Sequence, residues 1–212
     1  MTNSIKKLAG LGSGPISATP ADAKRLKSAF GSESADALLK LLGLKNGFYA
    51  FESALHVLSC DGNSQEYDVV RWNSADLWRN EYADMAEGCV FFAEDVFGNQ
   101  FCLRGRQVFT FDAETGALEL VTDGMDAWAE RILTDYDLWT GHRLARDWQE
   151  IHGAIPIGAR LVPTTPFVMG GEYAVGNLHA MESVKGMRYR ASIAVQIRDL
   201  PDGTAAKLKV VE

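Results

Sequence analysis

The chain has 212 residues, of which 47% are hydrophobic, and a formal net charge of −7. A chain of this length can bury roughly 70% of the surface that its unfolded form exposes, so one domain without stabilising disulfides is expected. The acidic balance argues against direct nucleic-acid binding, and no window approaches the ~20 consecutive apolar residues that a membrane span needs.

The N-terminal part of the chain is expected to contribute little to the fold. Residues 1–18 are rich in Gly and Ser and lack a repeating apolar face, which predicts a flexible arm. We therefore expect a single domain over residues 19–212. The same segment contains no signal-peptide core, because its apolar residues are interrupted by Gly, Ser and Pro. We expect a cytoplasmic protein.

Two short helices are predicted at the start of this domain. Thr19 can act as the N-cap of a helix that has Pro20 at its first position and ends at Gly31. Ser34 can cap a second helix over Ala35–Leu42, which Gly43 would end. Both predictions depend on local capping signals.

Extended segments are then predicted at Phe48–Phe51 and Ala54–Leu58, after the turn signal Asn46-Gly47. A further helix is expected to begin at Asn73. Asp76 lies three residues after this cap, and Trp72 and Leu77 flank the first turn. A capping box and a hydrophobic staple therefore coincide there.

The central part of the chain predicts an antiparallel meander. Four segments rich in Phe, Val and Leu are separated by polar turns, at Val90–Ala93, Phe97–Leu103, Val108–Phe111 and Leu118–Val121. The sequence Asp112-Ala-Glu-Thr-Gly116 is typical of a type I turn that ends in a left-handed glycine. Nothing in this stretch indicates catalysis.

The remaining third of the chain alternates between helix and strand. Apolar spacing predicts either one kinked helix or two over Asp126–Ile151, capped by Asp123 and broken near Gly141. Three prolines restrict Ile155–Phe167 to loops or an edge strand. A strand at Leu178–Val184 is expected next, then a helical face formed by Tyr189, Ile193, Ile197 and Leu200, a turn at Pro201–Gly203, and a last strand near Ala206–Val210.

The sequence shows no set of catalytic acid, base, nucleophile or metal-ligand residues, so we expect neither an enzyme nor a metal or cofactor site. The four histidines form no pair at helical spacing, and no G-x-S-x-G motif is present. The three cysteines show no CxxC pair, which is typical of buried side chains in a reducing compartment. The segment Gly10-Leu-Gly12-Ser-Gly14 follows no strand and lacks the Lys-Ser/Thr of a phosphate-binding loop.

The acidic charge is concentrated in one region. Between Cys60 and Gln100, nine Asp and Glu residues face only two arginines. Such a region attracts basic partners and raises their encounter rate. The alternative interpretation is a solvated face that keeps the protein soluble.

The motifs FFAEDVFGNQFCL and VFTFDAETGALELV, followed by a helix at Ala127–Leu133, resemble the SUKH superfamily. The segments LLKLLGLKNGFYAFESALHV and FVMGGEYAVGNLHAMESVKGMRYRASIAVQIRDLPDG are also similar to segments of that family. The resemblance covers about Ala35 to Val211. It implies an α+β fold, with an antiparallel or mixed twisted sheet that contains a central meander and packs against helices.

For most bacterial relatives the resemblance implies an immunity protein that binds and neutralises a toxin, often a nuclease. A eukaryotic branch is linked to cell-wall assembly signalling. Combined with the charge distribution, it predicts a basic toxin as the partner, and it predicts partner-binding carboxylates at Glu66, Asp68, Glu81, Asp84, Glu87, Glu94 and Asp95.

Two further expectations concern ligands and assembly. The rival function is a ligand- or partner-responsive regulatory module, in which the tryptophan-bearing helix and Gly170–Tyr173 border a pocket. The exposed edges of the meander make a homodimer an open alternative.

Overall fold

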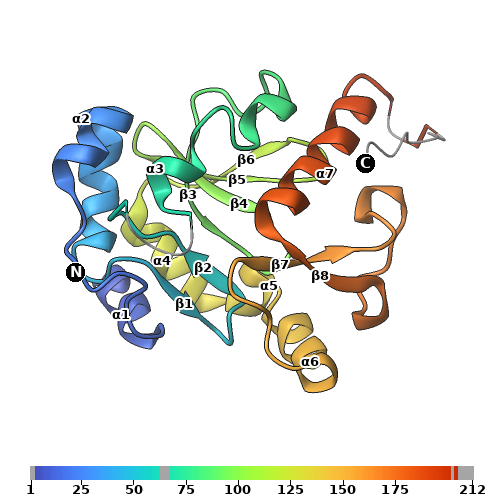
Figure 1. The fold of residues 1–212 in the computed structure, drawn as a ribbon, viewed down its shortest axis with the longest axis horizontal. Helices are drawn as coiled ribbons and strands as arrows, with labels where there is room; N and C mark the ends of the chain where they lie inside the picture. Colours follow the sequence, from blue (N-terminus) through green and yellow to red (C-terminus); the bar gives the residue numbers. More distant parts are fainter. Residues whose placement is uncertain (1–2, 63–66, 202, 205–212) are drawn as a thin grey trace.

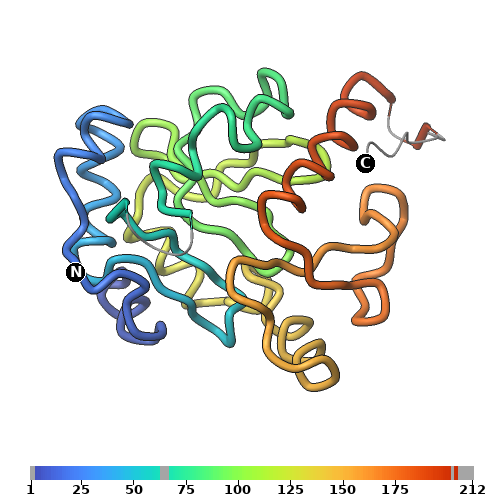
Figure 2. The backbone as a smooth tube through the Cα atoms, in the orientation of Figure 1, coloured from blue at the N-terminus to red at the C-terminus, as the bar shows by residue number. Residues whose placement is uncertain are grey.

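The computed structural model describes residues 3–62, 67–201 and 203–204 (Figure 1). The predicted last strand near Ala206–Val210 and the predicted partner residue Glu66 lie outside these ranges, as does the middle residue of the predicted turn Pro201–Gly203. The chain runs from two N-terminal helices on one side of the molecule to a C-terminal helix on the other (Figure 2).

A six-stranded antiparallel sheet forms the centre of the molecule, and its strands follow the order of the sequence. The fold is α+β, as expected, and the meander is confirmed as its last four strands. The strands are β1 (Phe48–Ala50), β2 (Leu55–Val57), β3 (Val90–Glu94), β4 (Gln100–Arg104), β5 (Gln107–Phe111) and β6 (Leu118–Thr122).

The turn between β5 and β6 has the predicted form. The amide of Gly116 donates to the carbonyl oxygen of Asp112 at 2.8 Å, and Gly116 has φ = 72°. The carboxylate of Asp112 accepts hydrogen bonds from the backbone amides of Glu114 (2.9 Å) and Thr115 (2.8 Å). A side chain at position 116 would be strained at this φ, which explains the glycine.

A second, two-stranded sheet lies beside the first. It consists of β7 (Ala159–Pro163) and β8 (Leu178–Glu182), and β8 leads directly into helix α7 (Ser183–Ile197). The amide of Leu161 donates to the carbonyl oxygen of Val96 at 2.8 Å, which joins this sheet to the loop after β3. The edge strand expected among the prolines is therefore confirmed. Tyr189, Ile193 and Ile197 lie in α7 as predicted, whereas Leu200 lies beyond its end and is exposed.

The N-terminal segment is helical, so the predicted flexible arm is wrong for the described part of it. Helix α1 (Ser4–Leu11) begins after Asn3, whose side chain accepts a hydrogen bond from the amide of Lys6. Ile5 and Leu8 are buried, and α1 packs against helix α4 (Met125–Thr134). Tertiary packing thus orders a segment whose local composition favours disorder.

Helix α2 (Ala23–Leu42) covers both predicted short helices, and Gly31 divides it into two helical parts with a non-helical φ of 75°. The break was predicted at this residue, whereas the cap was not. Asp22, not Thr19, caps the helix, because its carboxylate accepts hydrogen bonds from the amides of Lys24 and Arg25. Ser34 lies within the helix and is buried.

The prediction that a helix begins at Asn73 is wrong, because Asn73 caps the C-terminal end of a short helix. Helix α3 (Val69–Trp72) is capped by Asp68, and the 3₁₀ helix η1 (Arg79–Tyr82) follows. The Asn73 side chain bonds the backbone of Phe91 in β3, accepting from its N–H at 2.9 Å and donating to its carbonyl oxygen at 2.7 Å. A side chain held by the sheet cannot cap a following helix.

The region 123–152 contains three helices instead of one or two. Helix α4 is followed by α5 (Tyr136–Thr140) and α6 (His142–His152), and Gly141 separates the last two with φ = 69°. Gly124 and not Asp123 precedes α4 as its cap residue. Two 3₁₀ turns, η2 (Phe167–Met169) and η3 (Val175–Asn177), lie between β7 and β8.

Aromatic side chains fill the core on both faces of the large sheet. Successive strand residues point to opposite faces, so Phe91 packs against Trp78 at 5.0 Å between ring centroids, whereas Phe92 packs against Trp128 at 5.0 Å. Trp78 comes from the segment after α3, and Trp128 from α4. None of the helices in the described part of the chain combines the length and apolar character needed to cross a bilayer.

Candidate functional site

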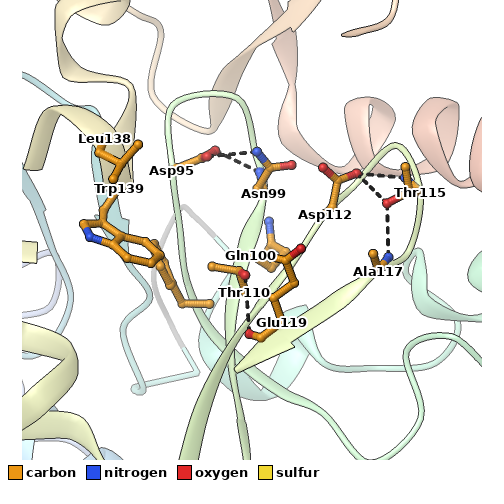
Figure 3. Close-up of a pocket in the computed structure, with 11 residues that line it drawn as sticks. Asp95, Asn99, Gln100, Thr110, Asp112, Thr115, Ala117, Glu119, Leu138 and Trp139 are labelled. Atoms are coloured by element: carbon orange, nitrogen blue, oxygen red, sulfur yellow. Dashed lines mark hydrogen bonds between the residues drawn. The ribbon is translucent and has the colours of Figure 1, made fainter. Parts of the chain in front are cut away.

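A hollow of about 380 Å³ opens where the loop after β3, the β5–β6 hairpin and helix α5 meet. We call it the Trp139 hollow. Leu138 and Trp139 form one side of it, and Asp112 and Thr115 of the hairpin lie on the opposite side (Figure 3). Asp95 also contributes to its wall. The hollow therefore combines an aromatic side with carboxylates.

A second hollow of about 240 Å³ adjoins the first, and the two share Asn99, Asp112 and Thr115. We call it the Tyr173 hollow. It adds residues from the loop between β7 and β8 and from α7. Its other lining residues are Phe97, Glu114, Phe167, Val168, Tyr173 and Arg190. Segments far apart in the sequence thus build two adjoining hollows, which together we call the groove.

Two acidic residues of the Trp139 hollow, Asp95 and Asp112, are held by local hydrogen bonds. Asp95 is buried and accepts hydrogen bonds from the amide and the side-chain nitrogen of Asn99, both at 2.9 Å. Burial raises the pKa of Asp95 to about 7, although the hydrogen bonds from Asn99 oppose this. Asp112 is oriented by the turn that it stabilises.

Glu114 presents a carboxylate that the chain satisfies only in part. Its side chain is 5% exposed, and its Oε2 accepts a hydrogen bond from the amide of Val168 at 2.8 Å. Its Oε1 is buried and has no hydrogen-bond partner among the described residues. Burial raises the pKa of Glu114, and interactions with the backbone amides of Val168 and Phe167 and with the charge of Arg190 act in the opposite direction.

Three aromatic rings surround this carboxylate's hollow. Phe167 and Tyr173 stack with 3.8 Å between their centroids and 5° between their planes, and Phe97 meets Phe167 edge-on at 5.4 Å. Tyr173 is 66% exposed. Arg190 is buried behind them, where its guanidinium donates to the carbonyl oxygens of Phe97 and Gly186.

The predicted partner residue Glu94 lies in the core and has an intramolecular role. Its carboxylate accepts hydrogen bonds from Arg160 Nε (2.8 Å) and Gln100 Nε2 (3.1 Å) and lies 2.9 Å from His56 Nδ1. Burial alone would raise the pKa of Glu94, but the charge of Arg160 and the hydrogen bonds lower it to about 2. Glu94 is 2% exposed, so it cannot contact a partner in this structure.

Asp68 is also buried and occupied within the chain. Its carboxylate caps α3 through the amides of Val70 and Arg71, accepts from the amide of Gly62 at 2.7 Å, and pairs with Arg25 at 2.7 Å. Asp68, Glu94 and Asp95 are all buried, so the prediction that they form a partner-binding acidic surface is wrong. Short polar side chains in an acidic stretch serve here as caps and core partners.

Glu81, Asp84 and Glu87 are exposed, and their partner-binding role stays a prediction. Glu81 pairs with Arg188 at 3.0 Å, and Asp84 pairs with Arg198. Both arginines come from the C-terminal helical region, so part of this negative charge is neutralised locally.

Sequence reasoning missed Glu114 and Glu119 as site residues and treated the Asp112–Gly116 segment only as a turn. It did place Tyr173 beside a pocket, together with the tryptophan-bearing helix, and both Tyr173 and Trp139 line the groove. The density of acidic residues in a hairpin turn is the signal that could have indicated the site. The described residues contain no cluster of three or more His, Cys, Asp or Glu side chains placed to hold a metal ion.

The fold and the two hollows together define an α+β protein with an acidic, partly aromatic surface depression. The structure is similar to the crystal structure of Atu4351 from Agrobacterium tumefaciens, with a TM-score of 0.50 over 90% of this chain and 87% of that chain. The two sequences are 10% identical, so the likeness concerns the fold alone. No family model and no curated protein matches the chain.

Proposed function

We propose that this chain is a SUKH-like immunity protein that binds a basic, nuclease-type toxin and blocks it without chemistry. The observation that carries the proposal is the acidic groove, where Asp112, Glu114 and Glu119 line adjoining hollows. The motif resemblance supports it, as does the net charge of −7. Its site of action would be the cytoplasm, where a nuclease meets nucleic acid.

The electrostatic argument concerns what a nuclease must expose. An enzyme that acts on nucleic acid binds phosphates with Lys and Arg, so its active-site cleft is positively charged. A protein that brings carboxylates to such a cleft gains a fast, salt-dependent association and excludes the substrate. The exposed residues Glu81, Asp84 and Glu87 would add to this attraction at longer range.

The test begins with capture of partners by the purified full chain from a lysate of its source cells, at low and at high salt. Each basic protein that is recovered is then expressed alone, and its effects on growth and on nucleic-acid integrity are measured. We expect toxicity, nuclease activity, and relief of both when this chain is added at equal concentration. A recovered partner that is harmless, or one whose activity this chain leaves intact, would contradict the proposal.

A regulatory module that responds to a small ligand is the second candidate. The observation that favours it is the pair of adjoining hollows of about 380 and 240 Å³, which Trp139 and Tyr173 line. A ligand that binds only the folded chain raises its melting temperature, and above the dissociation constant the shift grows with the logarithm of the ligand concentration. A melting screen with metabolites of the source cells tests this candidate, and a concentration-dependent shift that Tyr173→Ala abolishes would support it.

A homodimer is a separate proposal about assembly. β6 is an outer strand of the large sheet, and Leu120 on it is exposed. An outer strand offers unpaired backbone groups to a second copy. Analytical ultracentrifugation of the wild type and of a Leu120→Lys variant would test this pairing, and an unchanged monomer mass in both would reject it.

A further inference from the structure

Glu114 lines the Tyr173 hollow, and one of its two carboxylate oxygens is buried and has no hydrogen-bond partner among the described residues. Glu114 Oε2 is bonded to the amide of Val168 at 2.8 Å, whereas Oε1 is not hydrogen-bonded within the described residues. Buried polar groups in native proteins are nearly always paired, so a group left unpaired calls for a physical explanation. A ligand that donates a hydrogen bond would provide one.

The surroundings of Glu114 select the charge and shape of that ligand. The faces of Phe167 and Tyr173 are stacked at 3.8 Å, and Tyr173 leaves much of its side chain exposed at 66%. The face of an aromatic ring attracts cations, and planar guanidinium groups also stack on it. An aromatic wall beside a half-satisfied carboxylate therefore favours a donor that is both flat and positively charged.

The charged residues that line the hollow also favour a positively charged ligand. Asp112 lines it together with Glu114, and Asp95 lies in the adjoining hollow. Of the described residues that line the Tyr173 hollow, Arg190 is the only basic one, and its guanidinium is engaged with the carbonyl oxygens of Phe97 and Gly186. The charge of Arg190 lowers the pKa of Glu114, but two carboxylates line the hollow together with this single guanidinium. The hollow thus keeps a negative excess.

We propose that the Tyr173 hollow binds the guanidinium group of an arginine side chain that a partner protein inserts. In this arrangement the guanidinium donates to Glu114 Oε1 and lies against the ring of Tyr173. Arginine fits better than lysine because its charge is spread over a plane, is more weakly hydrated and offers several donors in fixed directions. The identity of the partner as a toxin rests on the function proposed above, whereas the ligand chemistry does not.

The first experiment uses methylguanidinium as a probe of the full-length chain labelled with ¹⁵N. Two signals report on the hollow, namely the Val168 amide, which donates to Glu114, and the Tyr173 amide. We expect saturable shifts of both with a dissociation constant of about 1–10 mM, as suits a fragment of this size. n-Butylammonium should bind about threefold or more weakly, and neutral n-butanol should leave both signals unchanged.

Matched variants decide whether the carboxylate and the ring carry the binding. Glu114→Gln should weaken methylguanidinium binding by about tenfold or more, because a charge-assisted hydrogen bond is lost. Tyr173→Ala should weaken it by about two- to fivefold. Glu130→Gln is the control, because Glu130 is exposed on α4 and its substitution changes the net charge equally. Equal binding by all four proteins, or shifts that never saturate, would overturn the proposal.

Circular dichroism and thermal melting of each variant show whether the fold is intact, and Tyr173→Ala is available if Glu114→Gln misfolds. The captured partner then separates the two proposals. If methylguanidinium binds but no toxin is found, the guanidinium site stands and the immunity function fails. If a toxin is neutralised equally by the wild type and Glu114→Gln, the immunity function stands and the arginine site is wrong.

Discussion

Glu94 and Glu114 are both nearly fully buried glutamates, at 2% and 5% exposure, but the chain treats them in opposite ways. Glu94 is surrounded by Arg160, His56 and Gln100, and its pKa falls to about 2. Glu114 receives a hydrogen bond on one oxygen, and burial raises its pKa. A buried carboxylate saturated by its own chain stabilises a fold, whereas one left half-satisfied can accept a partner from outside.

The elements that carry the two residues explain the difference. Glu94 ends β3 and meets side chains from β2, β4 and β7, so its partners are fixed by three neighbouring strands. Glu114 lies in the β5–β6 turn, where the opposite wall is the loop that begins at η2. Neighbouring strands place several fixed hydrogen-bond partners around one side chain. A turn that faces a loop supplies fewer partners, so part of the Glu114 carboxylate stays without one.

Removal of Arg160 is expected to have the largest effect. Arg160→Met would leave Glu94 charged in the core without its main cationic partner, because Arg160 is 1% exposed and donates to it at 2.8 Å. Breaking one side of a buried ion pair costs about 3–5 kcal/mol of unfolding free energy. Urea unfolding at pH 7 measures this loss. Arg146→Met on the exposed face of α6 is the control, and equal behaviour of the two variants would remove the structural role assigned to Glu94.

Asp95 sharpens the comparison, because it follows Glu94 directly and its pKa shifts the other way, to about 7. In the unfolded chain Asp95 loses its proton above its ordinary pKa of 3.8, whereas in the folded chain it keeps the proton up to about pH 7. Asp95 therefore lowers the unfolding free energy increasingly as pH rises from about 4 to 7. Asp95→Asn should therefore gain about 2 kcal/mol relative to the wild type between pH 5 and pH 8. The unfolding free energies at both pH values measure this gain, with Asp36→Asn as an exposed control. A parallel pH profile for wild type and Asp95→Asn would show that Asp95 is already ionised at pH 5.

Glu114→Gln should have a smaller effect, and of the opposite sign to the Arg160 variant. A raised pKa means that the ionised form of Glu114 is disfavoured in the fold, and this cost grows as pH rises above the ordinary value of 4.5. We expect the variant to be more stable than the wild type at pH 8, by less than Asp95→Asn gains, and equally stable at pH 4. Urea unfolding at the two pH values checks the sign. A loss of stability at pH 8 would place Glu114 with Glu94 as a structural residue.

The exposed acids should have the smallest effect on the fold. A variant that combines Glu81→Gln, Asp84→Asn and Glu87→Gln is expected to melt at the same temperature as the wild type, because exposed ion pairs contribute little. If these residues attract the partner, the association rate of the captured protein should fall and lose most of its salt dependence. Stopped-flow measurements at several salt concentrations test this, and an unchanged rate would move the interface elsewhere.

The large sheet could be predicted from sequence because its signals are local. Each strand of the meander is an aromatic or aliphatic segment next to a turn residue, and neighbours in sequence pair in space. The predictions failed where contacts with residues far away in the sequence outweighed the local signal. Asn73 is a good helix cap in isolation, but its side chain is bound to β3, and Ile5 and Leu8 order α1 only by packing on α4.

The carboxylates of the groove could not be predicted for a related reason. Glu114 and Tyr173 are far apart in sequence, and only the return of the chain after β7 brings their segments together. The region of highest acidic density instead supplied the predicted partner residues, and three of these, Asp68, Glu94 and Asp95, serve the interior. Charge density along a sequence does not distinguish a surface carboxylate from one that caps a helix or pairs in the core.

The strand order of the large sheet also has a consequence for how the protein folds. β1 to β6 pair only with their neighbours in sequence, so this sheet can form hairpin by hairpin with short loop closures, apart from the longer connection between β2 and β3. The Tyr173 hollow needs β7, β8 and α7 to dock afterwards. We expect pulsed hydrogen exchange during refolding to protect β4 and β5 before β8, and simultaneous protection would contradict this order. The chain would then acquire its binding competence as the last event of its maturation.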